Sequence, residues 1–185
     1  LFRVFLLGVC VFFFVGYGIQ PAVHYPRRRQ RQMWRRDRDF RETEAWYKER
    51  FGLVTSDEIE IAPGAPIGAF MRCDRGRTHV DHHTLFPVGT GAAGFNHAAF
   101  EVANFDDLMA GREVLAQSGR RHEWGVGRHK LGSQIFDYWR DPWGHTVEHW
   151  TDGDLFNNET PPNIATLDDL TGNQWGPPAP PSMGA

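Results

Sequence analysis

Cysteine is scarce in this chain of 185 residues: only Cys10 and Cys73 are present, far apart and outside any CxxC pair. Neither a disulfide framework nor a thiolate zinc site is therefore indicated. The chain also lacks an excess of charge of one sign, because its formal net charge is −3. Without a basic field, nucleic acid is not an expected partner. Histidine, by contrast, is abundant, with nine residues.

One long apolar run stands at the start of the chain. Residues 1–19 are almost wholly apolar, with Arg3 as their only charge, and an Arg-rich run follows at residues 27–36. The apolar run is long enough to span a bilayer, and its basic flank would keep the remaining chain on the cytoplasmic side. The alternative is a mis-joined reading frame, since the chain begins at Leu1. Residues 1–38 are therefore predicted as a leader, either an anchor or a mis-joined frame, and the expected location is cytoplasmic, with membrane anchoring if the leader is genuine.

Four positions are related by a fixed period. Gln32 and His83 are 51 positions apart, and His97 and Glu148 are also 51 apart, with an offset of 65 between the two pairs. A helical segment opens eight residues after the start of each pair. Self-similarity at one fixed period indicates a duplicated supersecondary unit, whose equivalent positions converge. Three of these four positions carry His or Glu.

Local signals around each pair predict a β-α-β-β-β unit. Asp39 suits the N-cap of a helix that ends at Gly52, and Asn104 suits the N-cap of a second helix that ends at Gly119. Asp-Pro-Trp-Gly at residues 141–144 is a strong turn signal between two strands of a hairpin. The predicted strands cover residues 53–60, 68–73, 79–88, 95–102, 129–140 and 145–150.

The two units, at about residues 30–90 and 94–151, predict an α+β domain of residues 39–158 whose paired βαβββ units form a curved mixed sheet. Residues 24–38 have no clear apolar face, so we expect them to be irregular or poorly packed. Residues 159–185 are Pro-rich without apolar periodicity, and we expect this tail to wrap the surface or stay mobile.

His97 and Glu148 have donor chemistry that suits a divalent iron, manganese or zinc ion. Two histidines and one carboxylate leave three positions of an octahedral iron open for other ligands. A lone strand histidine is more often a hydrogen-bonded core residue, however, and a strand glutamate often pairs with an arginine. The pattern alone therefore leaves a structural role as open as metal binding.

Residues 39–158 resemble the vicinal oxygen chelate superfamily, and specifically the metal-bearing half of extradiol ring-cleaving dioxygenases. The resemblance rests on Gly-Phe-Asn-His-Ala-Ala-Phe-Glu-Val at residues 94–102 and on the run from Phe136 to Glu148, which contains Asp-Pro-Trp-Gly-His-Thr-Val. His-His-Thr-Leu-Phe at residues 82–86 is similar to the family's segment with an acid–base histidine.

The resemblance implies a role for each matched residue. His97 and Glu148 are the expected ligands of Fe(II), with Mn(II) as an alternative metal. His83 is the expected acid–base residue, chosen over its neighbour because it satisfies the 51-residue spacing. His129 and Tyr138 stand nineteen and ten residues before Glu148, the spacing of the family's substrate-contacting pair. The implied substrates are a small aromatic diol and O₂, and homo-oligomerisation stays open.

Position 32 departs from this family pattern. The first iron ligand of the family is a histidine seven residues before the capping Asp39, and this chain has Gln32 there. His24 could replace it only with a shifted strand. We therefore expect an extradiol dioxygenase impaired in iron binding. The alternatives are a glyoxalase-type metal-dependent lyase or isomerase, and a metal-free binding module or inactive fragment.

Overall fold

Two βαβββ units make up most of the computed structural model, which describes residues 29–183, so the predicted α+β class is confirmed. The first unit contains β1 (Arg29–Asp37), α1 (Phe40–Phe51), β2 (Leu53–Ala62), β3 (Ala65–Cys73), the short β4 (Val80–Asp81) and β5 (Leu85–Gly89). The second contains β6 (Gly94–Glu101), α2 (Phe105–Gln117), β7 (His122–His129), β8 (Ile135–Arg140) and β9 (Thr146–Thr151).

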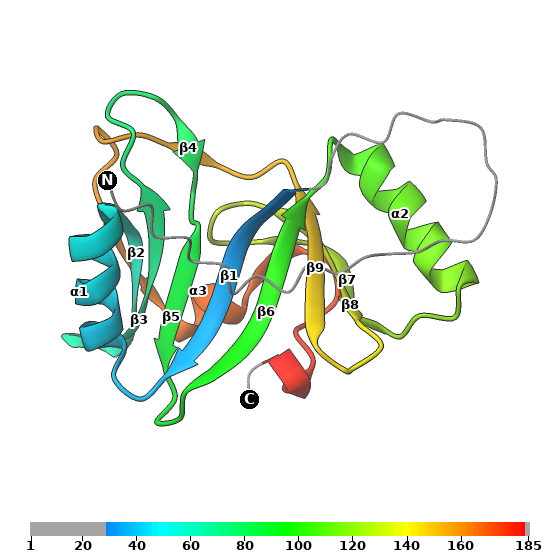
Figure 1. Ribbon diagram of the computed structural model, residues 1–185, viewed down its shortest axis with the longest axis horizontal. Helices are drawn as coiled ribbons and strands as arrows, with labels where there is room; N and C mark the ends of the chain where they lie inside the picture. Colours follow the sequence, from blue (N-terminus) through cyan, green and yellow to red (C-terminus); the bar gives the residue numbers. More distant parts are fainter. Residues whose placement is uncertain (1–28, 184–185) are drawn as a thin grey trace, which may run out of the picture.

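All strands of the two units except β4 lie in one mixed sheet with an approximate two-fold relation. Its order is β11-β2-β3-β5-β1-β6-β9-β8-β7-β12, where the edge strands β11 (Asn163–Thr166) and β12 (Asn173–Trp175) come from the tail. Within the units, β1 is parallel to β5 and β6 is parallel to β9, whereas β1 and β6 meet antiparallel at the centre. Helices α1 and α2 lie at opposite ends of the molecule, with the β1–β6 pair between them (Figure 1). The two units therefore share the middle of the sheet.

The predicted helix signals act as caps. The Asp39 carboxylate accepts hydrogen bonds from the backbone N–H groups of Arg41 at 3.0 Å and Glu42 at 3.2 Å. Gly52 ends α1 in the left-handed region, at φ 65°. In the second unit, the Asn104 side chain accepts from the Asp107 N–H at 2.9 Å. These bonds satisfy backbone donors that a helix leaves free in its first turn.

The prediction that residues 24–38 are irregular was wrong from residue 29 onward, because β1 is a central strand of the sheet. The arginines of β1 that discouraged a strand find carboxylates: Arg31 lies 2.8 Å from Glu101, and Arg35 lies 2.9 Å from Asp37. Between them, Gln32 is only 1 % exposed. His24 lies outside the described residues.

The second unit also differs from prediction in one hairpin. The expected strand at residues 129–140 is interrupted: β7 ends at His129 and β8 begins at Ile135, so the residues between them belong to neither strand. The strand over residues 122–129 was not predicted. The turn at residues 141–144 does join β8 to β9, whose register places Tyr138 opposite Glu148.

The Pro-rich tail follows the sheet closely. Four elements follow β9 and the short β10 (Leu155–Phe156): β11 (Asn163–Thr166), α3 (Leu167–Thr171), β12 (Asn173–Trp175) and a 3₁₀ turn (Pro181–Met183). β11 pairs with β2 and β12 pairs with β7, so the tail covers both edges of the sheet. Of the two behaviours expected for it, wrapping the surface is the one observed for the part described.

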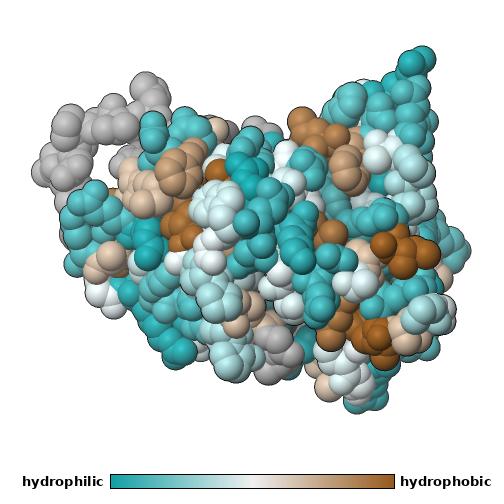
Figure 2. All heavy atoms as spheres, turned by 180° about the vertical axis from the view of Figure 1, so that it is seen from behind, coloured by the Kyte–Doolittle hydropathy of each residue, from teal (hydrophilic) through white to brown (hydrophobic). Residues whose placement is uncertain are grey.

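On one face of the molecule, hydrophobic and hydrophilic side chains are interspersed (Figure 2). Seen from the side opposite to Figure 1, hydrophobic side chains form separate patches among hydrophilic ones (Figure 2). Over residues 29–183, no helix has the length and apolar character needed to cross a membrane. The apolar run at residues 1–19 lies outside the described part.

Candidate metal and substrate site

His97 on β6 and Glu148 on β9 meet on one face of the sheet. Their side chains are 0 % and 2 % exposed, and His97 Nε2 lies 3.2 Å from Glu148 Oε2. The Asn96 side-chain oxygen lies 2.8 Å from His97 Nδ1 and accepts a hydrogen bond from that nitrogen. The unprotonated His97 Nε2, whose lone pair could bind a metal ion, therefore faces Glu148. A neutral imidazole nitrogen and a carboxylate side by side are what a divalent metal requires. The expected convergence of this pair is confirmed.

The strand register brings the third equivalent position, Gln32, to the same row. Gln32 on β1 is opposite Ala99 on β6, and Ala99 is opposite Glu148 on β9. Glu148 is in turn opposite Tyr138 on β8. Directly opposed residues point to the same side of a sheet. The small Ala99 therefore separates the Gln32 amide from the Glu148 carboxylate.

Several buried polar atoms in this region lack a hydrogen-bond partner among the described residues. Both amide atoms of Gln32, His97 Nε2 and Glu148 Oε1 are among them. Buried polar groups are nearly always paired, so such atoms indicate a missing ion or water. The donor set fits a divalent metal incompletely, because within residues 29–183 no three His, Cys, Asp or Glu side chains are arranged so that they could hold one metal ion. Gln32 can add only an amide oxygen.

His129 and Tyr138 lie beside this pair, as expected. His129 Nε2 is 3.0 Å from the Tyr138 hydroxyl and 3.8 Å from Glu148 Oε1. Burial and the nearby Glu148 raise the pKa of Tyr138 well above its ordinary value, so the phenol keeps its proton. Burial alone would raise the pKa of Glu148, but the adjacent His129 and His97 outweigh it and lower that pKa to about 2.

His83 ends a buried chain of hydrogen bonds that the sequence did not reveal. Asp57 Oδ2 lies 2.6 Å from His82 Nε2, and His82 Nδ1 lies 2.9 Å from His83 Nδ1. The indole N–H of Trp34 donates to His83 Nε2 at 3.5 Å. Since an indole only donates, the tautomers follow: His83 Nδ1 donates to His82, and His82 Nε2 donates to Asp57.

This chain fixes the state of His83. Burial lowers the pKa of His83 well below its ordinary value, and the neighbouring His82, His129 and His97 lower that pKa further. His83 is therefore a neutral imidazole whose Nε2 can accept a proton. The only sequence signal for the partners was the adjacent pair His82-His83; the spacing to Asp57 on β2 carried none.

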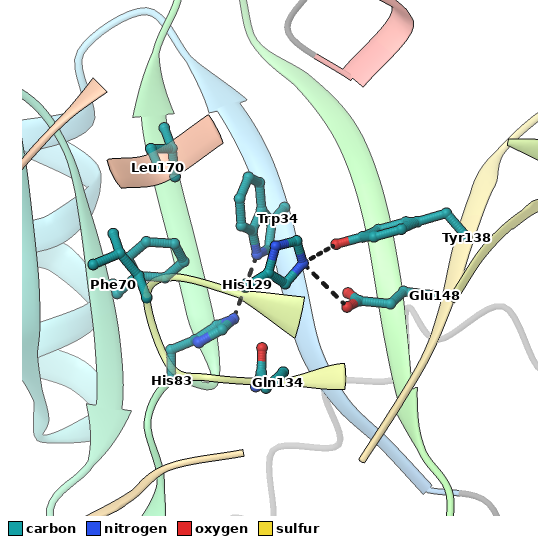
Figure 3. Close-up of a pocket in the computed structure, with 9 residues that line it drawn as sticks. Trp34, Phe70, His83, His129, Gln134, Tyr138, Glu148 and Leu170 are labelled. Carbon is teal, nitrogen blue, oxygen red and sulfur yellow. Dashed lines mark hydrogen bonds and ion pairs between the residues drawn. The ribbon is translucent and has the colours of Figure 1, made fainter. Parts of the chain in front are cut away.

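Four of the five predicted site residues line one small compartment. Its volume is about 10 Å³. Figure 3 shows Trp34 reaching toward His83, with Tyr138 and Glu148 on the other side. The lining residues are Trp34, Phe70, His83, His129, Leu131, Gln134, Tyr138, Glu148 and Leu170. Leu170 belongs to α3, so the tail also contributes to the site.

Known proteins with this sequence pattern and geometry fall in one group. Residues 30–149 match the family model of the Glyoxalase/Bleomycin resistance protein/Dioxygenase superfamily. The chain belongs to this superfamily. Among curated proteins it is similar to metapyrocatechase 2 of Cupriavidus necator, with 36 % identity over 138 residues, 73 % of this chain and 40 % of that protein. The chain thus spans about two fifths of the relative's length.

Solved structures of the superfamily share the fold. The Mn(II)-bound glyoxalase from Novosphingobium aromaticivorans matches with a TM-score of 0.70 and 21 % identity, over 83 % of this chain and 48 % of that one. Homoprotocatechuate 2,3-dioxygenase from Arthrobacter globiformis matches with a TM-score of 0.70 and 24 % identity, over 84 % and 48 %. At these identities the likeness establishes the superfamily fold alone.

Proposed function

We propose that this chain is the metal-bearing part of an extradiol-type dioxygenase that opens the ring of a small aromatic diol with O₂. The observation that carries the proposal is the convergence of His97 and Glu148 on one face, with His83, His129 and Tyr138 beside them. The similarity to metapyrocatechase 2 supports the same reaction class.

The residues that would hold Fe(II), or Mn(II) in its place, are His97 and Glu148, with the Gln32 amide as a weak third donor. When bound, the metal supplies a template for the diol and O₂ and a path for electrons between them. Glu148 is ionised at neutral pH, because its pKa is about 2. Because Gln32 replaces a histidine, we propose that the site is impaired.

The remaining residues handle the substrate and its protons. Tyr138 stays protonated, so its hydroxyl can donate to a substrate oxygen, and its bond to His129 fixes that hydroxyl in place. His83 is neutral, and its Nε2 can take a proton from the substrate hydroxyl and return it later, as general acid–base catalysis requires. Asp57 and His82 orient this imidazole.

A glyoxalase-type lyase or isomerase is the second candidate, and the buried Gln32 is the observation in its favour. That chemistry would draw one donor from each of the four symmetric positions, and Gln32 holds the first of them with both amide atoms buried and unpaired within the described structure. A glyoxalase-type reaction has no role for the hydrogen bond between His129 and Tyr138. The dioxygenase is therefore preferred.

The test measures iron content and oxygen uptake together. Purified protein reconstituted anaerobically with Fe(II) should retain some iron and consume O₂ with catechol or 2,3-dihydroxybiphenyl slowly if at all, and Glu148→Gln should abolish the iron retention and any uptake. Glu123→Gln is the matched control, because the Glu123 side chain is also only 4 % exposed but pairs with Arg140. Oxygen uptake that survives Glu148→Gln would refute the proposal, and hemithioacetal isomerisation without oxygen uptake would favour the glyoxalase type.

A further inference from the structure

Trp34 lines the compartment together with His83, Tyr138 and Glu148. Its indole ring lies 4.9 Å from the His97 ring and 4.5 Å from the Phe86 ring, measured between centroids. Its N–H points to His83 Nε2 at 3.5 Å. The side chain therefore contacts both an expected metal ligand and the expected acid–base residue, and Figure 3 shows it between the two sides of the compartment.

The two-fold relation of the units shows how unusual this side chain is at its position. Gln32 is opposite Ala99 and Trp34 is opposite His97, so Trp34 and Ala99 each stand two residues after an equivalent start position. Ala99 is 0 % exposed and leaves room beside His97. The first unit has the largest side chain where the second has one of the smallest.

The space left over is too small for a substrate ring. About 10 Å³ remains, which is room for one water molecule. A cavity that holds a benzene ring is on the order of 150 Å³. The rest of the lining combines apolar side chains (Phe70, Leu131, Leu170) with polar ones (His83, His129, Gln134, Tyr138, Glu148), and the indole of Trp34 is the largest side chain among them.

We propose that Trp34 closes this compartment to a planar aromatic diol, so that the size of residue 34 decides whether the ring can enter. The inference rests on the proposed function for the identity of the substrate, but its steric part does not depend on metal or turnover. Trp34 blocks in two ways: its ring fills the volume, and its N–H occupies the His83 nitrogen that would accept a proton.

The test is ligand binding to the metal-free chain of 185 residues by titration calorimetry, with indole and catechol as probes. The unmodified chain should show no saturable binding. Trp34→Ala should bind indole, which refills the cavity, and should bind catechol at least about tenfold more tightly than the unmodified chain, a gain of about 1.4 kcal/mol. Trp34→Leu opens less space, so it should bind catechol but not indole.

Trp139→Ala is the matched control, because Trp139 is also buried, at 4 % exposure, but its indole N–H donates to Asp137. Tyr138 and Trp139 are successive residues of β8, so their side chains point to opposite faces of the sheet. The inference is overturned if Trp139→Ala binds catechol as tightly as Trp34→Ala does, or if the unmodified chain binds catechol saturably. Should Trp34→Ala fail to fold, Trp34→Leu decides in the same way. Catechol binding by Trp34→Ala, together with no ring cleavage by the Fe(II)-reconstituted double variant Gln32→His, Trp34→Ala, would count against the proposed function and leave the steric inference standing.

Discussion

Replacing Gln32 by histidine should restore the missing metal ligand. Gln32 is 1 % exposed, lies in one row with Ala99 and Glu148, and has two amide atoms without a partner in the described structure. A histidine there completes a set of two imidazoles and one carboxylate, which leaves three open positions on an octahedral iron. Loss of residues that only support ligands costs about 10–100-fold in metal affinity, so gaining a direct ligand should tighten Fe(II) at least that much.

This gain corresponds to at least about 1.4–2.7 kcal/mol of binding free energy. The assay is an anaerobic competition titration of Fe(II), repeated with Mn(II), against a coloured chelator. Gln134→His is the matched control: Gln134 is 2 % exposed, its amide nitrogen is also unpaired within residues 29–183, and it lines the same compartment, but it lies outside the ligand row. An equal gain in the control, or no gain in natively folded Gln32→His, would refute the reasoning.

Two further predictions concern buried carboxylates. The folded-state pKa of Glu148 is about 2 against an ordinary 4.5, so its stabilisation is complete above pH 4.5 and is lost as the pH falls toward 2. The difference in free energy of unfolding between the protein and Glu148→Gln, measured with urea, should therefore shrink by about 3 kcal/mol from pH 5 to pH 2. A difference that does not change with pH would contradict this. Asp57→Asn places an amide against the His82 N–H and should lower the free energy of unfolding by about 2 kcal/mol. Asp74→Asn, at an exposed position, is its control in the same urea titration and should change little.

The sequence was most informative where local chemistry decides structure. The caps at Asp39 and Asn104 and the turn at residues 141–144 predicted helix starts and a hairpin that the structure contains. The fixed offset between the units also predicted that His97 and Glu148 converge, because duplicated strands place equivalent positions on one face. These signals need only nearby residues or a period, both of which a single sequence displays.

Strand β1 could not be predicted because its stability comes from partners distant in the sequence. Its arginines look incompatible with a central strand until Glu101 is placed 2.8 Å from Arg31. Met33 packs on the buried cluster of Leu53, Ala69, Met71 and Leu85. The same holds for Asp57, which reaches His82 across the sheet. Whether His97, Glu148, His83, His129 and Tyr138 carry the proposed roles stays a prediction.

Both departures from a working site lie on β1, two residues apart and on one face, and they act on different steps. Gln32 limits metal binding, whereas Trp34 limits entry of the ring. Gln32→His alone should therefore bind iron without brisk turnover, and Trp34→Ala alone should bind catechol with little retained iron. The double variant should do both, and its oxygen uptake with catechol should exceed the product of the two single gains, because residues that act as one unit are not additive. Full turnover in Gln32→His with Trp34 in place would show that the indole does not close the compartment.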